Sequence, residues 1–122
     1  MEWDVIVHHD KKIIEVITRG SADKSGSMAM AQVLAESMRR HRFTRGLIDH
    51  RNIAGVSGDV LDVYERPRLL RLIGLILGIR IAAVIDERYT EHFKFLETVS
   101  MNQGFQYMAF VDSGKALEWL LK

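Results

Sequence analysis

The sequence has no cysteine, which excludes a disulfide framework, a cysteine-ligated zinc site and a thiol nucleophile. Proline is almost absent, since Pro67 is the only one among 122 residues. An excess of either charge is also missing, because 17 Lys and Arg against 16 Asp and Glu give a formal net charge of +1. A general nucleic-acid coat protein needs a basic excess, so we expect no nucleic-acid partner.

Long apolar runs are missing as well. The longest one extends from Leu69 to Ile81, and Arg71 and Arg80 interrupt it. A membrane span needs about 20 apolar residues, and the first residues lack the basic region and apolar run of a targeting segment. We therefore expect a soluble, cytoplasmic protein without a membrane span. The length and the hydrophobic fraction of 48% fit one globular domain over residues 1–122.

Several short segments have the pattern of β-strands. Two β-branched runs, Val5–Val7 and Ile13–Ile17, stand on either side of a polar break and predict a hairpin. Further apolar strands are predicted at Gly46–Asp49, Ile79–Ile85 and Tyr107–Val111.

Amphipathic segments lie between these strands. Apolar residues recur at spacings of three and four from Ser27 onward, which predicts a helix. A second helix follows the expected loop Gly55–Asp59, and Pro67 should break it before a new segment, Arg68–Leu77. The last two helices are expected to follow caps at Thr90 and Ser113.

This order predicts an α/β fold with an N-terminal β-hairpin followed by alternating helices and strands. Strands that are apolar throughout and alternate with helices are typical of parallel sheets. We expect a mostly parallel sheet of four to five strands, covered by about four helices.

Three aspartates, Asp49, Asp86 and Asp112, each end a predicted strand. In a parallel sheet they would gather at the carboxyl edge, where open α/β sheets bind ligands. Carboxylates there suit Mg²⁺, which gives one hypothesis, a magnesium-dependent enzyme. The interpretation we favour is turn chemistry, in which Asp accepts backbone N–H bonds. Because no glycine-rich phosphate loop follows these strands, we assign no catalytic residue and expect no cofactor.

The histidines do not form a metal motif. None shows the spacing that places ligands on one helix face, and neighbours in a strand, such as His8 and His9, point to opposite sides. We therefore predict no metal site. The histidines in question are His8, His9, His41, His50 and His92.

Positive charge is concentrated in one stretch that contains only one acid, Asp49. Its local charge of about +4 would favour an acidic partner or a phosphate. The first three of its arginines are also explained by the negative end of the helix dipole. The stretch consists of Arg39, Arg40, Arg42, Arg45 and Arg51.

The segment that begins at Ser57 is the main candidate binding region. Its part after Pro67 is apolar all the way round a helix, so it should be buried on more than one side. The side of this helix that does not face the sheet would pack against a neighbouring helix, a second copy in a homodimer, or an apolar ligand. Arg66 and Arg68 would then receive an anionic group, and a phosphate on Ser57 would meet a helix N-terminus unless Ser57 is only a cap. The apolar candidates are Leu69, Leu72, Ile73 and Ile76.

Several segments resemble the STAS family of sulfate-transporter and anti-sigma-factor-antagonist domains, and in particular its SpoIIAA-like, or STAS/SEC14, branch. The resemblance implies a non-catalytic regulatory module with an unidentified protein partner, and the SEC14 comparison implies a carrier or sensor of an apolar or lipid-like ligand as the alternative. The segments concerned are Leu47-Ile48-Asp49-x-Arg51, Ala82–Asp86, Met108–Asp112 and Lys115–Leu120.

The family also implies a phosphorylation site. Its anti-sigma antagonists carry Asp-Ser-Ser-Gly after the middle strand, and the second serine is phosphorylated by a partner kinase. Ser57-Gly58 falls in the corresponding place, whereas Gly55-Val56 replace the preceding Asp-Ser. The expected partner surface is the loop and helix from Ser57 to Arg71.

Overall fold

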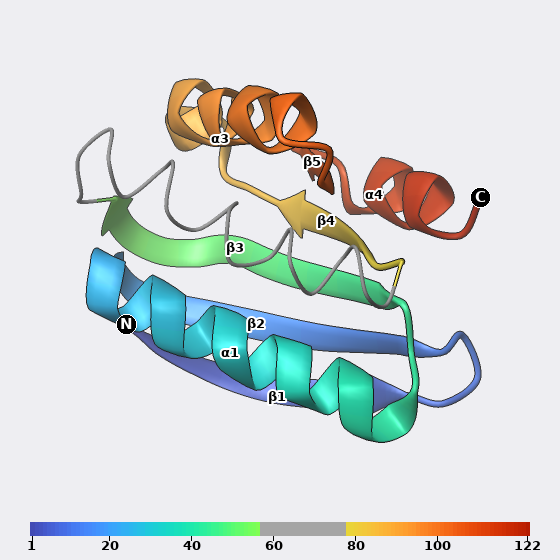
Figure 1. Ribbon diagram of the computed structural model, residues 1–122. Helices are drawn as coiled ribbons and strands as arrows, with labels where there is room; N and C mark the ends of the chain where they lie inside the picture. Colours follow the sequence, from blue (N-terminus) through green and yellow to red (C-terminus); the bar gives the residue numbers. More distant parts are fainter. Residues whose placement is uncertain (57–77) are drawn as a thin grey trace.

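The structure is a computed structural model that describes residues 1–56 and 78–122 (Figure 1). The interval 57–77 lies outside the described residues, and the main candidate binding region falls within it. The candidates concerned are Ser57, Arg66, Arg68, Leu69, Leu72, Ile73 and Ile76.

The described residues alternate between strands and helices around one sheet. The sheet has five strands in the order β1-β2-β3-β4-β5, with β1 antiparallel to β2 and all other pairs parallel. The predicted hairpin and mostly parallel sheet are confirmed, and the described parts hold three α-helices against the four or so expected. In chain order the elements are β1 (Glu2–His8), β2 (Ile13–Ala22), α1 (Lys24–His41), β3 (Arg45–Val56), β4 (Arg80–Val84), the 3-10 turn η1 (Glu87–Tyr89), α3 (Thr90–Asn102), β5 (Gln106–Phe110) and α4 (Ser113–Leu120).

One face of the sheet packs against α1 and α3 and holds the larger core. Strand residues such as Ile14 and Ile81 meet Leu34 and Met38 of α1 and Phe93 of α3 in one buried cluster. Here α1 lies close to the sheet because β3 has a glycine: a Cβ at Gly46 would stand 2.7 Å from Ile81 Cδ1 and 3.2 Å from Met38 Sδ. We call this side the closed face.

The opposite side, which we call the open face, packs only against α4 among the described helices. Ala116 and Leu120 of α4 bury Leu47, Ala82 and Val84. Because α4 has only 8 residues and contacts β3, β4 and β5, the β1–β2 side of this face lies away from it. That side carries charged residues, such as Asp4, Glu15 and Arg19, beside the apolar Ile6 and Ile17.

Helix α1 begins one turn earlier than predicted. It starts at Lys24 and not at Ser27, because Asp23 is the cap and its Oδ1 accepts a hydrogen bond from Gly26 N at 2.6 Å. At the other end Arg42 closes the helix in the left-handed region, with φ 57°.

The two predicted caps in the C-terminal half are also corrected. Helix α4 is capped by Asp112 and not by Ser113, since Asp112 Oδ1 accepts from Gly114 N at 2.7 Å. Thr90 is the first residue of α3, and its hydroxyl donates to Glu87 O at 2.7 Å. In α4 the carboxylate takes the position because it is a stronger acceptor for N–H groups than a hydroxyl.

Strand β3 is much longer than the predicted Gly46–Asp49. It runs to Val56, which pairs with Ala22 at the end of β2, so Gly55 and Val56 belong to a strand and not to the predicted loop. The pairing of β2 with β3 shifts by one residue after Asp49, which indicates a β-bulge. The polar sequence at this bulge concealed the continuation of the strand.

No helix in the described part of the chain is long and apolar enough to cross a membrane. 

Candidate functional site

A pocket of about 150 Å³ lies on the open face, between α4 and the β1–β2 hairpin. Its apolar lining comes from Ile13, Leu47, Val84 and Leu117. Its polar lining comes from His8, Lys11, Glu15, Asp49, Arg51 and Ser113.

The strand register places these residues together. Glu15 of β2 stands beside Leu47 of β3, and Asp49 stands beside Val84 of β4. Because alternate residues of a strand share a face, Leu47 and Asp49 both point to the open face. The start of α4, at Ser113, forms the remaining wall.

Asp49 and Arg51 form the most constrained ion pair of the pocket. The Arg51 guanidinium donates from Nη2 to Asp49 Oδ2 at 2.8 Å and from Nε to Oδ1 at 3.0 Å, while Arg51 N donates to Oδ1 at 3.0 Å. Burial acts to raise the pKa of Asp49, but the hydrogen bonds from Arg51 outweigh it, and the pKa lies below its usual value. The carboxylate is therefore ionised at neutral pH although the residue is only 6% exposed.

A second pair, His8 and Glu15, joins the two strands of the hairpin. His8 Nε2 and Glu15 Oε1 are 2.7 Å apart. The two pairs also interact, because the charge of Glu15 contributes to raising the pKa of Arg51, after the larger effect of Asp49. The pocket thus presents alternating basic and acidic groups above an apolar base, which suits a small polar molecule with an apolar part.

Comparison with known proteins gives a fold but no sequence family. No family model matches the sequence, and no curated protein matches it. Solved structures resemble it as well, among them two that cover nearly the whole chain. One is an uncharacterised protein of the DUF3478 family from Shewanella loihica PV-4, described as having a SpoIIAA-like fold, with 18% identity, a TM-score of 0.56 and coverage of 98% of this chain and 92% of that chain.

The other is the anti-sigma factor antagonist SpoIIAA in its unphosphorylated form, with 11% identity, a TM-score of 0.58 and coverage of 97% of this chain and 96% of that chain. The chain has a SpoIIAA-like fold. The architecture expected from the STAS resemblance is therefore confirmed. Sequence identities this low support a shared fold and no shared function.

Within this SpoIIAA-like fold, the three aspartates do not form one site. Asp49 lies inside β3, so its expected place at a strand end is wrong, and the reason is the continuation of the strand beyond the bulge. Asp86 does follow β4, where its Oδ1 accepts from Arg88 N at 2.9 Å and the Arg88 guanidinium lowers its pKa. Asp112 caps α4. Each carboxylate accepts a backbone N–H two residues later, as turn chemistry predicts.

No group of three His, Asp or Glu side chains within residues 1–56 and 78–122 is arranged to hold a metal ion. His50 is on the closed face, where its ring stacks on Phe93 at 5.0 Å and its Nδ1 is 2.7 Å from Thr18 Oγ1. It is therefore a core residue. His9 and His41 contact each other near the hairpin, with ring centroids 5.8 Å apart.

Reasoning from the sequence missed His8, Lys11, Glu15 and Ser113 as lining residues of one pocket. The hairpin pattern could have indicated two of them. Pairing of His8 with Ile13 places His8 and Glu15 on the same face, because alternate residues of a strand share a face. Nothing local indicates that α4 would place Ser113 beside them.

Proposed function

We propose that this chain is a non-catalytic regulatory module that binds a protein partner through the surface from Ser57 to Arg71. The observation that supports the proposal most is the likeness to SpoIIAA, a protein described as an anti-sigma factor antagonist, over 97% of this chain. That protein is described in its unphosphorylated form, which is consistent with a role for Ser57 as a modified residue.

The position of the proposed surface in the chain also supports this function. Ser57 directly follows Val56, the last residue of β3, which pairs with Ala22 beside the start of α1. Strand β3 ends with Val56 at the carboxyl edge of the sheet, where α/β proteins commonly bind their ligands.

The composition of the surface indicates the kind of partner. Arg66 and Arg68 are basic and are followed by an apolar run. A partner with an apolar patch bordered by acidic groups would match both features.

The test is affinity capture from an extract of the source organism with the tagged full chain. We expect one partner to be captured by the wild type and lost with the double variant Arg66→Glu and Arg68→Glu. Lys115→Glu, an exposed lysine of α4, is the matched control and should retain the partner. Equal capture by all three forms would contradict the proposal.

Ser57 is tested in the same assay. If a phosphate at this position regulates binding, Ser57→Glu should change capture of the partner while Ser57→Ala behaves like the unmodified protein. Identical capture by both variants, with intact mass spectrometry finding no phosphate on the protein from its own cells, would reduce Ser57 to a capping residue.

The second candidate function is a sensor of a small molecule, and the pocket around Asp49 favours it. Its volume of about 150 Å³ is below the range of drug-sized pockets, so it suits a ligand of few heavy atoms and not a lipid chain. The lipid-like ligand expected under Leu69 to Ile79, like the homodimer, remains a prediction, because most of that segment lies outside the described residues.

Native mass spectrometry of protein purified from its own cells tests this candidate. Leu117→Trp should fill the pocket and remove any bound small molecule, whereas Leu121→Trp on the exposed side of the same chain end should leave it bound. Unliganded wild-type protein would count against a sensor function. A magnesium-dependent enzyme would instead show a rise in melting temperature with Mg²⁺ through binding linkage.

A further inference from the structure

We propose that the amino edge of the parallel strands binds a phosphate group, at a site separate from the Asp49 pocket. A second pocket, of about 190 Å³, lies there. Its lining contains three cationic side chains and no acidic one. The lining residues are Thr44, Arg45, Gly78, Arg80, Gln106, Leu120 and Lys122.

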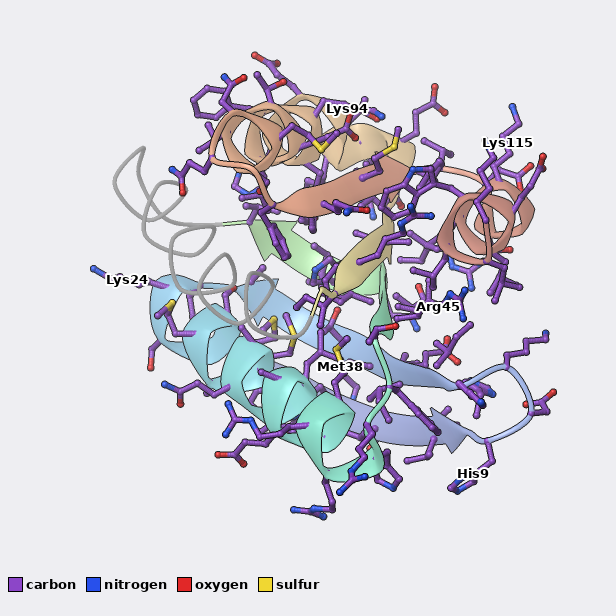
Figure 2. All side chains as sticks on the ribbon, turned by 45° about the vertical axis from the view of Figure 1, so that its right-hand side comes forward. His9, Lys24, Met38, Arg45, Lys94 and Lys115 are labelled. Atoms are coloured by element: carbon purple, nitrogen blue, oxygen red, sulfur yellow. The ribbon has the colours of Figure 1, made fainter. Side chains whose placement is uncertain are left out.

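The sheet register brings the cations together. Arg45 is the first residue of β3 and Arg80 the first residue of β4, and the two are direct partners in the parallel ladder. Adjacent strands are about 4.8 Å apart, so the two arginine side chains project from the open face next to each other. In Figure 2, Arg45 lies between α4 and the β1–β2 hairpin. Gln106, the first residue of β5, continues the row.

Neutral contacts hold both guanidinium groups in place. Arg45 Nε donates to Leu120 O at 2.9 Å, Arg80 Nη1 donates to Trp119 O at 2.9 Å, and Arg80 Nε donates to Gln106 Oε1 at 3.0 Å. The Arg80 guanidinium also stacks on the Trp119 ring, 4.9 Å from its centroid. Such prior ordering reduces the entropy that a ligand must remove on binding.

Part of this arrangement has a structural explanation. The carbonyl groups of Trp119 and Leu120 end helix α4, and cations commonly satisfy such groups. That role uses only some of the N–H donors of each guanidinium. Among the described residues, neither arginine is bonded to a carboxylate, so no ion pair within this part of the chain neutralises their charges.

The balance of charges at this edge favours an anion. The end of α4 contributes a partial negative charge of about half an elementary charge, and the chain-end residue Lys122 brings a carboxylate, against three cationic side chains in the lining. The hairpin tip, the end of α1, the start of β4 and the C-terminus all lie at the same end of the molecule (Figure 1). That end adds further cations, together with two acids, Asp10 in the hairpin turn and Glu118 of α4. The added cations are Lys11, Lys12, Arg39, Arg40 and Arg42.

A phosphate group is the anion that fits best. Its size suits a pocket of about 190 Å³, and its oxygens accept paired hydrogen bonds from planar guanidinium groups. The hydroxyl of Thr44 and the amide of Gln106 are further donors in the lining. Inorganic phosphate and the end group of a phosphate ester share this chemistry.

Titration of the full chain with phosphate, followed by ¹⁵N NMR, tests the proposal. At constant ionic strength we expect saturable shifts of the amide signals of Thr44, Arg45, Arg80 and Gln106. Pyrophosphate and a phosphate monoester, such as glycerol phosphate, are added in separate titrations. A tighter response to the monoester than to inorganic phosphate would identify an ester as the natural form. Chloride shifting the same signals equally would overturn the proposal.

Variants separate the site from general charge. Arg80→Gln should weaken phosphate binding about tenfold, since a charge-assisted hydrogen bond is lost, and Lys122→Glu should weaken it without affecting the sheet. Arg88→Gln is the matched control, because this exposed arginine is paired with Asp86 at the other edge, and it should bind like the wild type. If Arg80→Gln does not fold, Lys122→Glu alone decides. Unchanged binding in Lys122→Glu, or an equal loss in Arg88→Gln, would overturn the proposal.

Discussion

The two faces of the sheet are built from alternate residues of the same strands, yet they have different chemistry. The closed face holds a continuous apolar cluster from Ile14 and Ile81 to Phe93, and its buried polar pair, Thr18 and His50, is internally hydrogen-bonded. On the open face, the short helix α4 covers only β4 and its neighbours, so charged side chains remain between α4 and the hairpin. Both pockets, around Asp49 and around Arg80, lie on this open face. The closed face therefore holds the fold together, and the open face is available for recognition.

The largest expected difference between the faces concerns removal of a large apolar side chain. Phe93→Ala on the closed face should lower the free energy of unfolding by about 3–5 kcal/mol, because it leaves a cavity in a packed core. Ile6→Ala on the open side of β1, where Ile6 is 39% exposed, should lower it by less than about 1 kcal/mol. Urea denaturation measures the free energy of unfolding of both variants. Similar losses in the two would contradict the inference that the closed face contributes more to stability than the open face.

Overpacking should reveal the same distinction with a smaller effect. Gly46→Leu places a side chain where a Cβ alone would be 2.7 Å from Ile81 Cδ1, and it should cost about 1–3 kcal/mol. Gly55→Leu is the matched control in the same strand, where the nearest contact of a Cβ is Ser21 Oγ at 3.9 Å. Thermal unfolding of the pair measures the difference, and equal stability would show that α1 moves away from the sheet without a penalty.

The ion pair on the open face should contribute stability that depends on pH. Asp49→Asn should lower the free energy of unfolding by about 1–2 kcal/mol at neutral pH, because Arg51 loses its charged partner. The pKa of Asp49 is lowered in the folded state, so the stabilisation is fully present above the unfolded value, about 3.9. It should decline as the pH falls through the lower folded value. Denaturation of both forms between pH 7 and about pH 2 measures this, and a difference that grows with acidity would contradict the assignment.

The smallest effect is expected at the exposed edge of the same face. Arg19 contacts Asp4 and Glu2 there, and all three side chains are exposed. Such pairs are screened by water and salt, so Arg19→Ala should leave the melting temperature unchanged within the accuracy of calorimetry. A clear drop that disappears in high salt would show that surface charges on this face also stabilise the fold.

Local sequence patterns correctly predicted the elements whose apolar residues are continuous. The predicted strand Ile79–Ile85 corresponds to β4, Arg80–Val84, and the hairpin and the last two helices were also found in place. These succeed because side-chain alternation and helical periodicity are properties of neighbouring residues. The full length of β3 was not predicted, because the polar residues Arg51 and Asn52 interrupt its apolar pattern and its second half is held by pairing with β2.

The candidate sites follow the same division. That Asp112 and Asp86 would accept backbone hydrogen bonds could be predicted, since those partners lie two residues away. The sequence by itself also determined the absence of cysteine chemistry and the alternation that leads to a mostly parallel sheet. Only the tertiary structure decided that Arg45 meets Arg80 and that Glu15 lies near Arg51. Those contacts depend on strand register and on the position of α4, which are set by packing between residues far apart in the chain.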